Sequence, residues 1–429
     1  MKTIISGGKV IDPSQDLDGL FDVAIEDGVI YDIFPTGKAD LKADNVIDAK
    51  GLIVMPGIID MHVHLRDPGY EYKEDIESGT LAAAAGGVTA VACMANTKPV
   101  NDNATVTEEI LKKAKDKGHV KVYPIGAATM GLKGEELAEI GSMHAAGIVA
   151  VSDDGMPLKS SEMMRCVLEY SLTFDMPVIS HAEDPDLSKN GSMNEGYLST
   201  IMGLKGVPNA AEDVMVMRDI TLSELTGAKL HIAHISTEGA VSLVREAKKR
   251  GVKVTAEAAP HHFTITESAV EGYKTDAKMN PPLRSEKDVT AIRKGLKDGT
   301  IDAIATDHAP HSSIEKDVEF ECAANGILGL ETMLPLTLKL VDEGVLSLTE
   351  AIRKLTINPA EIIGVQGGSL KKGMPADITI VDLNAEHTVD RNRMKSKSKN
   401  TPFHGWTFKG KTLYTLVNGE IVYKEEIDE

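Results

Sequence analysis

Residues 58–67 read IIDMHVHLRD, an apolar run that ends in two histidines one residue apart. The run Ile58–Val63 predicts a short buried strand. Side chains alternate between the two faces of a strand, so His62 and His64 point the same way while Val63 points into packing. Two imidazoles on one face can hold one metal ion. A single strand histidine is more often a core residue, so the interpretation of this pair depends on the residues that surround it.

Short apolar runs of the same kind recur along the middle of the chain and alternate with helical stretches. Strands are predicted at Ile58–Val63, Val88–Met94, Val120–Ile125, Ile148–Ser152, Val178–His181, Leu230–Ile235, Val252–Glu257 and Ile301–Thr306. Helices are predicted at Thr105–Lys115, Ser160–Phe174, Glu212–Thr226, Gly239–Arg250, Glu286–Leu296, Met333–Glu343 and Leu348–Leu355. This α/β rhythm is typical of a closed parallel (β/α)8 TIM barrel, predicted over residues 55–364. An open doubly wound sheet is disfavoured because no GxGxxG motif opens a helix after a strand.

The two ends of the chain differ from this middle part. The first fifty residues alternate short β-like runs with Gly-Gly, Asp-Pro and Asp-Gly turn signals, and the last sixty are similar. Asn418 and Gly419 stand between two alternating apolar runs, which is a strong hairpin signal. We therefore expect residues 1–54 and 365–429 to pair into one small β-sandwich domain.

Polar residues stand at the C-terminal ends of five of the predicted strands. They are His62 and His64, the pair Asp153 and Asp154, then His181, His234 and Asp307. In a barrel these ends meet at one mouth, where such enzymes carry out their chemistry. Imidazoles with carboxylates suit two borderline ions such as Zn²⁺ better than Ca²⁺ or Mg²⁺. One carboxylate should bridge the ions, and only one of the adjacent Asp153 and Asp154 can face the mouth.

Composition narrows the classes of function. A formal net charge of −19 disfavours binding to nucleic acid or to anionic membranes. One well-placed arginine can still hold an anionic substrate. The three cysteines include no CxxC motif, which indicates reduced thiols rather than a disulfide framework. No apolar run has the length of a signal peptide or of a membrane span, so the cytoplasm is the expected location.

From HVHLRDPG onward the sequence resembles the dihydroorotases of the amidohydrolase superfamily, of the longer bacterial type. The matching segments are MPGIIDMHVHLRDPG, MANTKP, SDDG, SHAED, IAHIST, APHHF, KMNPPLR, ATDHAPH and NTPFHGW, and they span essentially the whole chain. HVHLRDPG together with ATDHAPH is fairly specific, whereas HxH alone indicates only the superfamily. Related hydantoinases, dihydropyrimidinases and allantoinases usually carry a carboxylated lysine after strand 4, and residues 151–155 contain no lysine.

This resemblance implies a role for each candidate residue. The metal ligands would be His62, His64 and Asp307 on one zinc ion, His181 and His234 on the other, and Asp154 on both. The substrate would contact His64, Arg66, Asn96, Asn280, Asp307, His311 and the main chain of Asn325 and Gly326. Arg66 lies two residues past His64, on the same face if the strand persists, where its guanidinium can grip a carboxylate.

The implied activity is that of a cyclic amide hydrolase, which converts dihydroorotate into N-carbamoyl-aspartate and runs in reverse during pyrimidine synthesis. A hydroxide shared by the metals would attack the ring carbonyl. Asp307 would take the proton of this hydroxide and pass it to the leaving ring nitrogen. The family suggests a homodimer, and a complex with aspartate transcarbamoylase is compatible with an active enzyme.

Two alternatives stay open at this point. An allantoinase or hydantoinase would act on a different ring, but the missing lysine and the pair Arg66 and Asn96 argue against it. An inactive dihydroorotase-like subunit could serve as a scaffold for aspartate transcarbamoylase. Such proteins typically lose metal ligands, and this chain keeps all six.

Overall fold

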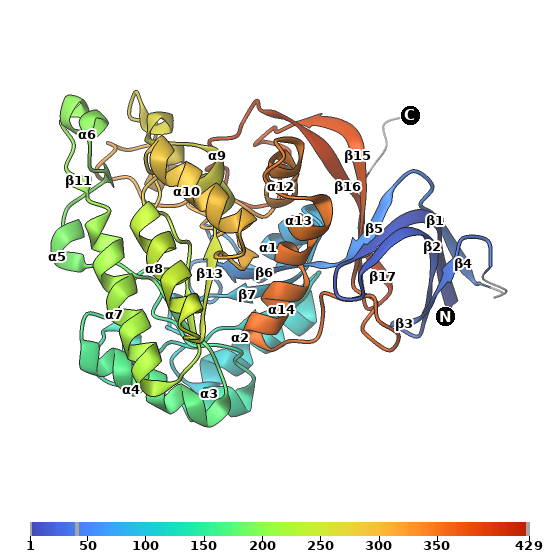
Figure 1. Ribbon diagram of the computed structural model, residues 1–429, viewed down its shortest axis with the longest axis horizontal. Helices are drawn as coiled ribbons and strands as arrows, with labels where there is room; N and C mark the ends of the chain where they lie inside the picture. The colour runs from blue at the N-terminus through green and yellow to red at the C-terminus, as the bar shows by residue number, and fades with distance from the viewer. Residues whose placement is uncertain (1, 39–42, 426–429) are drawn as a thin grey trace.

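The computed structural model describes residues 2–38 and 43–425. Figure 1 shows helices wrapped around a set of strands, and beside them a sheet that holds strands from both ends of the chain. The domain spans predicted for the two ends also include residues 1, 39–42 and 426–429, which lie outside the described residues. Within the described part of the chain, no helix combines the length and apolar character needed to cross a membrane.

The central strands run parallel and follow one another in chain order. One set consists of β6 (Ile58–Val63), β7 (Val88–Cys93) and β8 (Lys121–Pro124), and the other of β9 (Val178–Ser180), β12 (Leu230–Ile232), β13 (Val254–Ala258) and β14 (Ala303–Ile304). Parallel bridges from Gly126 to Val151 and from Val151 to Val178 join the two sets. A further parallel bridge from Val63 to His308 joins the first strand to the end of the last. These pairings place the strands and the segment around Val151 in a closed ring.

The fourth predicted strand, Ile148–Ser152, differs from the prediction, because only Val151 forms β-bridges there. The segment still hydrogen-bonds to its neighbours, since Val149 N donates to Pro124 O at 3.1 Å and Val151 N to Pro177 O at 3.3 Å. Both acceptors are prolines, which have no N–H to return to the ladder. The segment therefore keeps its place in the ring, although it does not form a regular strand.

Helices cover the outside of the ring (Figure 1). Their bounds are α1 Ile76–Ala85, α2 Ala104–Lys117, α3 Ile140–Ala146, α4 Ser161–Ser171, α5 Pro185–Ser188, α6 Tyr197–Met202, α7 Ala210–Thr226, α8 Glu238–Lys249, α9 Pro260–Thr264, α10 Glu286–Lys297, α11 Ser313–Lys316, α12 Met333–Asp342, α13 Leu348–Leu355 and α14 Ile357–Ile363. The predicted helices agree closely because side-chain caps mark their starts: Asn103 caps α2 and Thr237 caps α8. Helices α1, α3, α5, α6, α9, α11 and α14 lie outside the predicted set; the alanine-rich sequence of α1, for example, carries little amphipathic pattern.

Both ends of the chain meet in one eight-stranded sheet. Its strands are β1 (Lys2–Asp12), β2 (Leu17–Glu26), β3 (Val29–Pro35), β4 (Asn45–Asp48), β5 (Ile53–Pro56), β15 (Ile378–Thr388), β16 (Thr407–Val417) and β17 (Glu420–Lys424). The N-terminal β5 pairs antiparallel with the C-terminal β15, as the expected pairing of the chain ends requires. Asn418 and Gly419 form the predicted β16–β17 turn, both with a positive φ.

Seven strands of this sheet form one hydrogen-bonded path and β4 branches from it at β1, so all eight belong to a single sheet, where a sandwich would have two separate sheets. The sheet curls instead: a register shift between Ile5 and Gly8 interrupts β1, and a bridge from Val29 to Pro375 brings the β3 edge back beside the segment before β15. Its inward side chains, from Val23 in β2 to Leu416 in β16, share one buried cluster. Curvature thus gives one sheet the enclosed core that two stacked sheets would have had.

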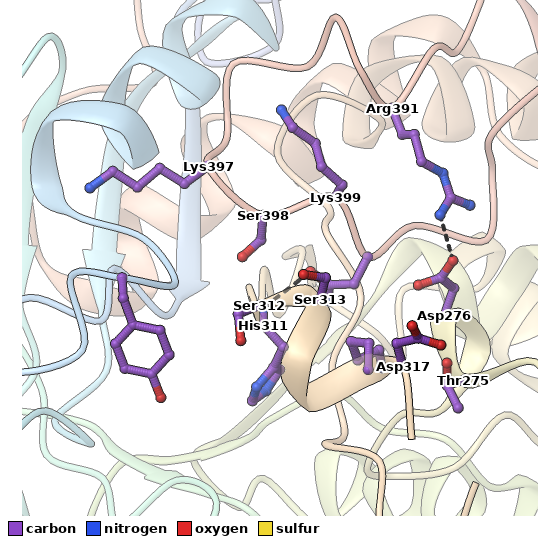
Figure 2. Close-up of a pocket in the computed structure, with 13 residues that line it drawn as sticks. Thr275, Asp276, His311, Ser312, Ser313, Asp317, Arg391, Lys397, Ser398 and Lys399 are labelled. Carbon is purple, nitrogen blue, oxygen red and sulfur yellow. Dashed lines mark hydrogen bonds and ion pairs between the residues drawn. The ribbon is translucent and has the colours of Figure 1, made fainter. Parts of the chain in front are cut away.

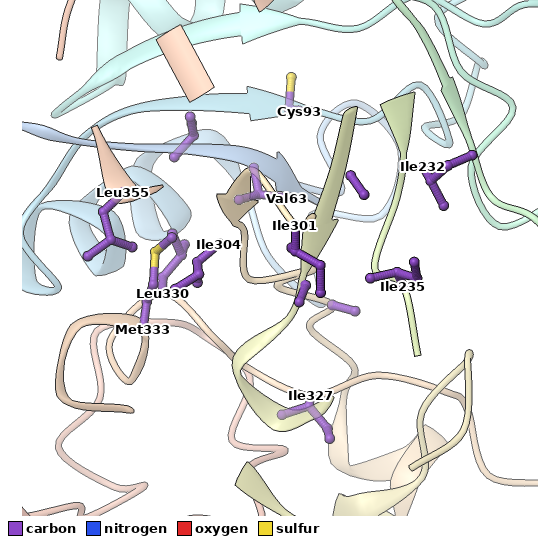
Figure 3. Close-up of a cluster of buried hydrophobic side chains, with 14 of the residues drawn as sticks. Val63, Cys93, Ile232, Ile235, Ile301, Ile304, Ile327, Leu330, Met333 and Leu355 are labelled. Atoms are coloured by element: carbon purple, nitrogen blue, oxygen red, sulfur yellow. The ribbon is translucent and has the colours of Figure 1, made fainter. Parts of the chain in front are cut away.

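Two apolar clusters hold the ring. Inside it, small side chains such as Ala90, Ala92 and Ala303 pack together. Between the ring and the helices lies a larger cluster, part of which is drawn in Figure 3, where Ile304 of β14 lies near Met333 of α12. The abundant alanine therefore serves close packing within the ring, while branched side chains fill the outer layer.

Candidate active site

The six predicted metal ligands come together at the C-terminal ends of the ring strands. His62 is the last residue but one of β6 and His64 lies just beyond its end, and Asp154, His181, His234 and Asp307 each follow a strand or the Val151 segment. All six residues are buried, and none has more than 6% of its surface exposed to solvent. His234 and Asp307 have a positive φ of 31° and 48°, which turns the chain sharply where each strand ends.

One group of possible ligands consists of His62, His64 and Asp307. His64 Nε2 lies 3.0 Å from Asp307 Oδ1, and His62 Nε2 lies 3.5 Å from the same oxygen. This is the set that the sequence assigned to the first ion.

A second group consists of His62, Asp154 and His234. His234 Nε2 lies 3.4 Å from Asp154 Oδ1 and accepts or donates a 2.8 Å hydrogen bond with His181 Nδ1. His181 Nδ1 is itself 3.6 Å from Asp154 Oδ1. Asp154 also reaches the first group, because its Oδ2 is 3.4 Å from His64 Nε2. Its two oxygens therefore face both sets of imidazoles, which is the geometry a bridging ligand needs.

Several atoms at the centre of this cluster are buried without a hydrogen-bond partner. Among the described residues they include His62 Nε2, Asp154 Oδ1 and His234 Nδ1. An unpartnered buried polar group costs roughly 1–3 kcal/mol, so a folded protein rarely keeps several together without a ligand. Nitrogen and carboxylate donors converging on one space fit a borderline metal ion.

Electrostatics keep the carboxylates of the cluster ionised. Burial by itself favours neutral Asp154, but His62, His181 and His234 outweigh it and hold the pKa of this carboxyl well below its usual value. The pKa of Asp307 is also lowered, because His62 and His64 outweigh its burial. Both side chains are therefore ready to act as anionic ligands, and Asp307 can accept a proton.

Glu257, which the sequence reasoning did not single out, orients His62. Its Oε1 accepts a 2.6 Å hydrogen bond from His62 Nδ1, which leaves His62 Nε2 facing the cluster. Its Oε2 lies 3.2 Å from His231 Nε2, and His231 Nδ1 is 2.8 Å from Thr255 Oγ1. The signal in the sequence is an acidic residue inside an otherwise apolar strand, since such a group is seldom buried unless it is paired.

Glu183 is a second residue that the sequence reasoning missed. It stands two residues after His181, the same spacing as His62 and His64. Its Oε2 accepts a 2.7 Å hydrogen bond from Asn280 Nδ2 and lies 3.4 Å from His181 Nε2. Burial raises its pKa, but His181 and the other hydrogen-bond donors outweigh this and lower the pKa to about 2. Asn280 is therefore held beside the cluster by an ionised carboxylate.

Arg66 reaches the mouth by a different route from the one expected. Strand β6 ends at Val63, and Arg66 has a φ of +62°, so the idea that it continues the strand face of His64 is wrong. A turn carries it instead to His311, where Arg66 Nη2 lies 3.3 Å from His311 Nε2. Burial and the Arg66 charge lower the pKa of His311 to about 3, so this imidazole is neutral at pH 7.

The other predicted substrate residues lie in two places, beside the metal cluster and beside His311. Asn96 Oδ1 is 2.9 Å from His64 Nδ1, so this side chain adjoins the metal cluster. Gly326 adjoins His311, since a Cβ at this glycine would lie 2.7 Å from His311 Cδ2. Asn325 is exposed. The backbone of Gly326 is already engaged, because its N–H donates to Lys278 O at 2.9 Å.

Asp153 and two neighbouring histidines stay outside the cluster. Asp153 is buried rather than on the surface, and its Oδ1 accepts from Ala128 N and Thr129 N. It therefore anchors the loop after β8, while Asp154 faces the mouth. His261 and His262 are buried beside the site, and burial lowers the pKa of both.

Known proteins with the same sequence pattern carry the same family name. A dihydro-orotase-like family matches residues 51–240, and an amidohydrolase family matches residues 213–423. A protein of Acetivibrio thermocellus named dihydroorotase is 56% identical over 427 residues, which cover 99% of both chains. Another of that name, from Geobacter metallireducens, is 57% identical over 424 residues, 99% of this chain and 100% of the relative. The chain belongs to the dihydroorotase family.

The fold of this dihydroorotase-family chain is similar to that of solved α/β structures from related enzymes. An L-hydantoinase (dihydropyrimidinase) from Arthrobacter aurescens has a TM-score of 0.89 at 27% identity, covering 98% of this chain and 96% of that one. A D-hydantoinase with a TM-score of 0.87 at 23% identity shares the fold. The chain is accordingly an enzyme of the amidohydrolase superfamily. Its relation to the dihydroorotases is much closer in sequence than its relation to the hydantoinases.

Proposed function

We propose that this chain is a dihydroorotase, which hydrolyses (S)-dihydroorotate reversibly to N-carbamoyl-L-aspartate in pyrimidine synthesis. The observation that carries the proposal is the juxtaposition of the buried histidine and carboxylate cluster with Arg66 and His311. The cluster supplies the machinery for opening a cyclic amide. The arginine supplies a binding partner for a carboxylate on that ring.

The metal assignments form part of the same proposal. His62, His64 and Asp307 would hold one Zn²⁺, His181 and His234 the other, and Asp154 both. When bound, such ions polarise a carbonyl group and lower the pKa of water enough for attack at neutral pH. The buried His62 Nε2 and Asp154 Oδ1 support this assignment, since neither has a hydrogen-bond partner in the described structure and each can offer a lone pair to a metal ion.

Substrate orientation follows from the hydrogen bonds of the neighbouring side chains. Arg66 presents its guanidinium to the carboxylate of the substrate, beside neutral His311. Asn96 uses its Oδ1 on His64, so its amide nitrogen can donate to the substrate. Asn280 uses its Nδ2 on Glu183, so its amide oxygen can accept from a ring N–H. Asn325 and Gly326 would line the ring from the opposite loop.

Asp307 is proposed as the catalytic proton carrier. Its carboxylate is buried, ionised and 3.0 Å from His64 Nε2, at the place where the first group of ligands meets. It can take a proton from the attacking water and give it to the ring nitrogen as the amide bond breaks. Reversal of these steps closes N-carbamoyl-aspartate into the ring.

The finer points of architecture and setting are proposals as well. We take the closed ring with its helices as a (β/α)8 TIM barrel over residues 55–364, and the curled sheet as a small β domain of residues 1–54 and 365–429. We propose a homodimer in the cytoplasm, with zinc as the metal. Association with aspartate transcarbamoylase is part of this proposal and can be tested by co-purification. Because the chain keeps all six residues that the family resemblance assigns to the metal ions, an inactive scaffold subunit is disfavoured.

A substrate panel tests the function. The purified protein is assayed with dihydroorotate, N-carbamoyl-aspartate, hydantoin and allantoin, each with and without a chelator. We expect turnover of the first two only, and loss of that turnover after chelation with recovery on adding Zn²⁺. Turnover of hydantoin or allantoin without dihydroorotate would reject the proposal, and activity that resists removal of the metal would reject the metal mechanism.

A further inference from the structure

A segment from the end sheet lies across the candidate active site. Residues 391–400, between β15 and β16, read RNRMKSKSKN, with a basic residue at every odd position from 391 to 399. The even positions Met394, Ser396, Ser398 and Asn400 are buried. We call residues 391–400 the strap. In Figure 2, the strap residues Lys397, Ser398 and Lys399 lie near His311 and Ser312 at the edge of a cavity of about 530 Å³.

The buried side of the strap is bonded to loops at the mouth of the ring. Ser398 Oγ donates to Lys73 O at 2.7 Å, and Ser396 Oγ donates to the carboxylate of Glu74. The backbone N–H groups of Lys395 and Ser396 both donate to Glu331. These contacts fasten the strap to the loop after β6 and to the start of α12.

The three basic side chains of the strap that line this cavity, Arg391, Lys397 and Lys399, are engaged within the protein. Arg391 is paired with Asp276 at 2.7 Å, as the dashed line in Figure 2 shows. Lys397 is paired with Asp75, and Lys399 Nζ donates to Met394 O and Ser396 O, both at 2.8 Å. The strap therefore contributes position rather than free positive charge to the site.

Asn400, at the end of the strap, bonds to both loops that carry predicted substrate residues. Its Oδ1 accepts from His311 N at 3.1 Å. Its Nδ2 donates to Ala309 O and to Gly326 O, both at 3.0 Å. Asn400 is 3% exposed, and its own backbone O accepts from Leu328 N at 3.0 Å. The side-chain amide of Asn400 thus joins residues 309–311 to Gly326, in addition to the direct backbone hydrogen bond from Ala309 N to Ile327 O.

We propose that Asn400 is a positioning residue that fixes His311, and through it Arg66, in the substrate pocket. The expected effect on catalysis rests on the proposed function, whereas the contacts of Asn400 with the two loops are independent of that function. His311 touches Arg66 directly, so a shift of the His311 backbone changes the place of the guanidinium. Gly326 moves with it, since the two loops share the same amide. The metal cluster lies on other side chains and should stay intact.

Asn400→Asp is the sharpest test, because it keeps size and shape but replaces the amide donor with an anion facing two carbonyl oxygens. We expect the KM for dihydroorotate to rise roughly tenfold or more, with a smaller fall in kcat, since substrate positioning is lost and not the chemistry. Zinc content and Tm are measured alongside. Asn400→Ala provides a second variant that removes the same bonds without adding charge.

Ser398→Ala is the matched control. It removes the anchor of the same strap to Lys73 O but touches neither residues 309–311 nor residues 326–328, so KM should stay within about twofold of the wild-type value. An equal rise in KM in Ser398→Ala and Asn400→Asp would overturn the proposal, because it would show general loosening of the strap. A KM within twofold in both Asn400 variants would overturn it too.

Hydrogen exchange gives a readout that does not depend on turnover. In Asn400→Asp, the amide of His311 and the peptides spanning residues 308–328 should exchange faster, while those in Ser398→Ala should not. Unchanged exchange in this region rejects the proposal even if the wild-type protein proves to act on another substrate. Failure of the wild-type protein in the substrate panel, with faster exchange here, rejects only the proposed function.

Discussion

At the scale of single residues, the side chains proposed to bind metal and carry a proton lie at the centre of the cluster, and other side chains orient them from farther out. Asp154 and Asp307 reach the centre of the cluster, whereas Glu257 and Glu183 approach from behind the histidines. The orientations of the His62 and His181 rings therefore depend on carboxylates that lie farther from the centre of the cluster. Two predictions follow from this division.

Asp307→Asn should lower kcat for dihydroorotate by about 10²–10⁴-fold, because the amide keeps the shape but cannot carry the proton. The measurement is steady-state kinetics on protein whose zinc content and circular dichroism match the wild type. Asp302→Asn is the matched control, since Asp302 lies at the opposite end of the same strand segment and pairs with Lys248. Wild-type kcat in Asp307→Asn would remove this residue from the proton-carrying role.

Glu257→Gln should weaken zinc binding by roughly 10–100-fold, because His62 loses the carboxylate that orients its ring. Competition with a metal chelator of known affinity measures the change. Glu246→Gln serves as control, since Glu246 lies on the surface of α8 and pairs only across one turn with Lys249. Equal zinc affinity in the two variants would show that Glu257 has no part in holding the metal.

At the scale of helices and strands, apolar periodicity and caps proved reliable guides. The predicted limits of β6 and α13 agree with the structure at both ends, Ile58–Val63 and Leu348–Leu355. Both carry local signals, namely a run that is apolar except for Asp60 and His62, and a Ser347 capping box. The segment Ile148–Ser152 has the same apolar pattern but faces prolines on both neighbours, and pairing partners are not visible in a local pattern.

The candidate site could be predicted only in part. Residues at strand ends follow a local pattern, whereas residues on turns or with distant partners do not. Strand ends bring His62, His181 and Asp307 to one mouth whatever the loops do, so spacing predicted the candidate group, while the choice of Asp154 over Asp153 came from the family resemblance. The position of the Arg66 side chain depends on a turn in which Arg66 has a positive φ, and the sequence does not reveal this turn. Glu257 and Asn400 act through contacts with residues far along the chain, which no local pattern encodes.

Ile304→Ala tests how the ring is held to its helices. Ile304 is fully buried in the cluster between β14 and helices α12 and α13, so the cavity left by the shorter side chain should cost about 2–5 kcal/mol. Urea unfolding followed by fluorescence and circular dichroism measures it. Ile314→Ala, at a residue 83% exposed, should change stability by no more than about 0.5 kcal/mol. Similar losses in both variants would contradict the assigned core.

At the scale of the whole molecule, the end sheet and the ring are joined by polar contacts as well as by packing. Asp377, next to β15, accepts from Lys121 Nζ of β8 at 2.5 Å and from Asn418 N at 2.9 Å. Thr379 Oγ1 donates to Gly87 O at 2.6 Å, close to the same place. The sheet is thus attached to the side of the ring near β7 and β8.

Asp377→Ala should lower the stability of the entire protein by about 1–3 kcal/mol, because it leaves Lys121 and the β16–β17 turn without their acceptor. Calorimetry should still show one unfolding transition, at a lower Tm. Lys372→Ala, which removes a surface ion pair with Asp32, should cost at most about 1 kcal/mol. Two separate transitions in the wild-type protein would show that sheet and ring unfold independently.

The position of the strap in the chain has a consequence for how the protein is made. Residues 391–400 are synthesised after every strand of the ring and every helix around it. Domains of a growing chain tend to fold as they emerge, N-terminal parts first. The metal-binding histidines can therefore gather before Asn400 exists, while the His311 and Gly326 loops still lack their shared partner. Until residues 391–400 are added, the His311 and Gly326 loops lack the contacts of Asn400, which ties full ordering of the proposed substrate pocket to completed synthesis.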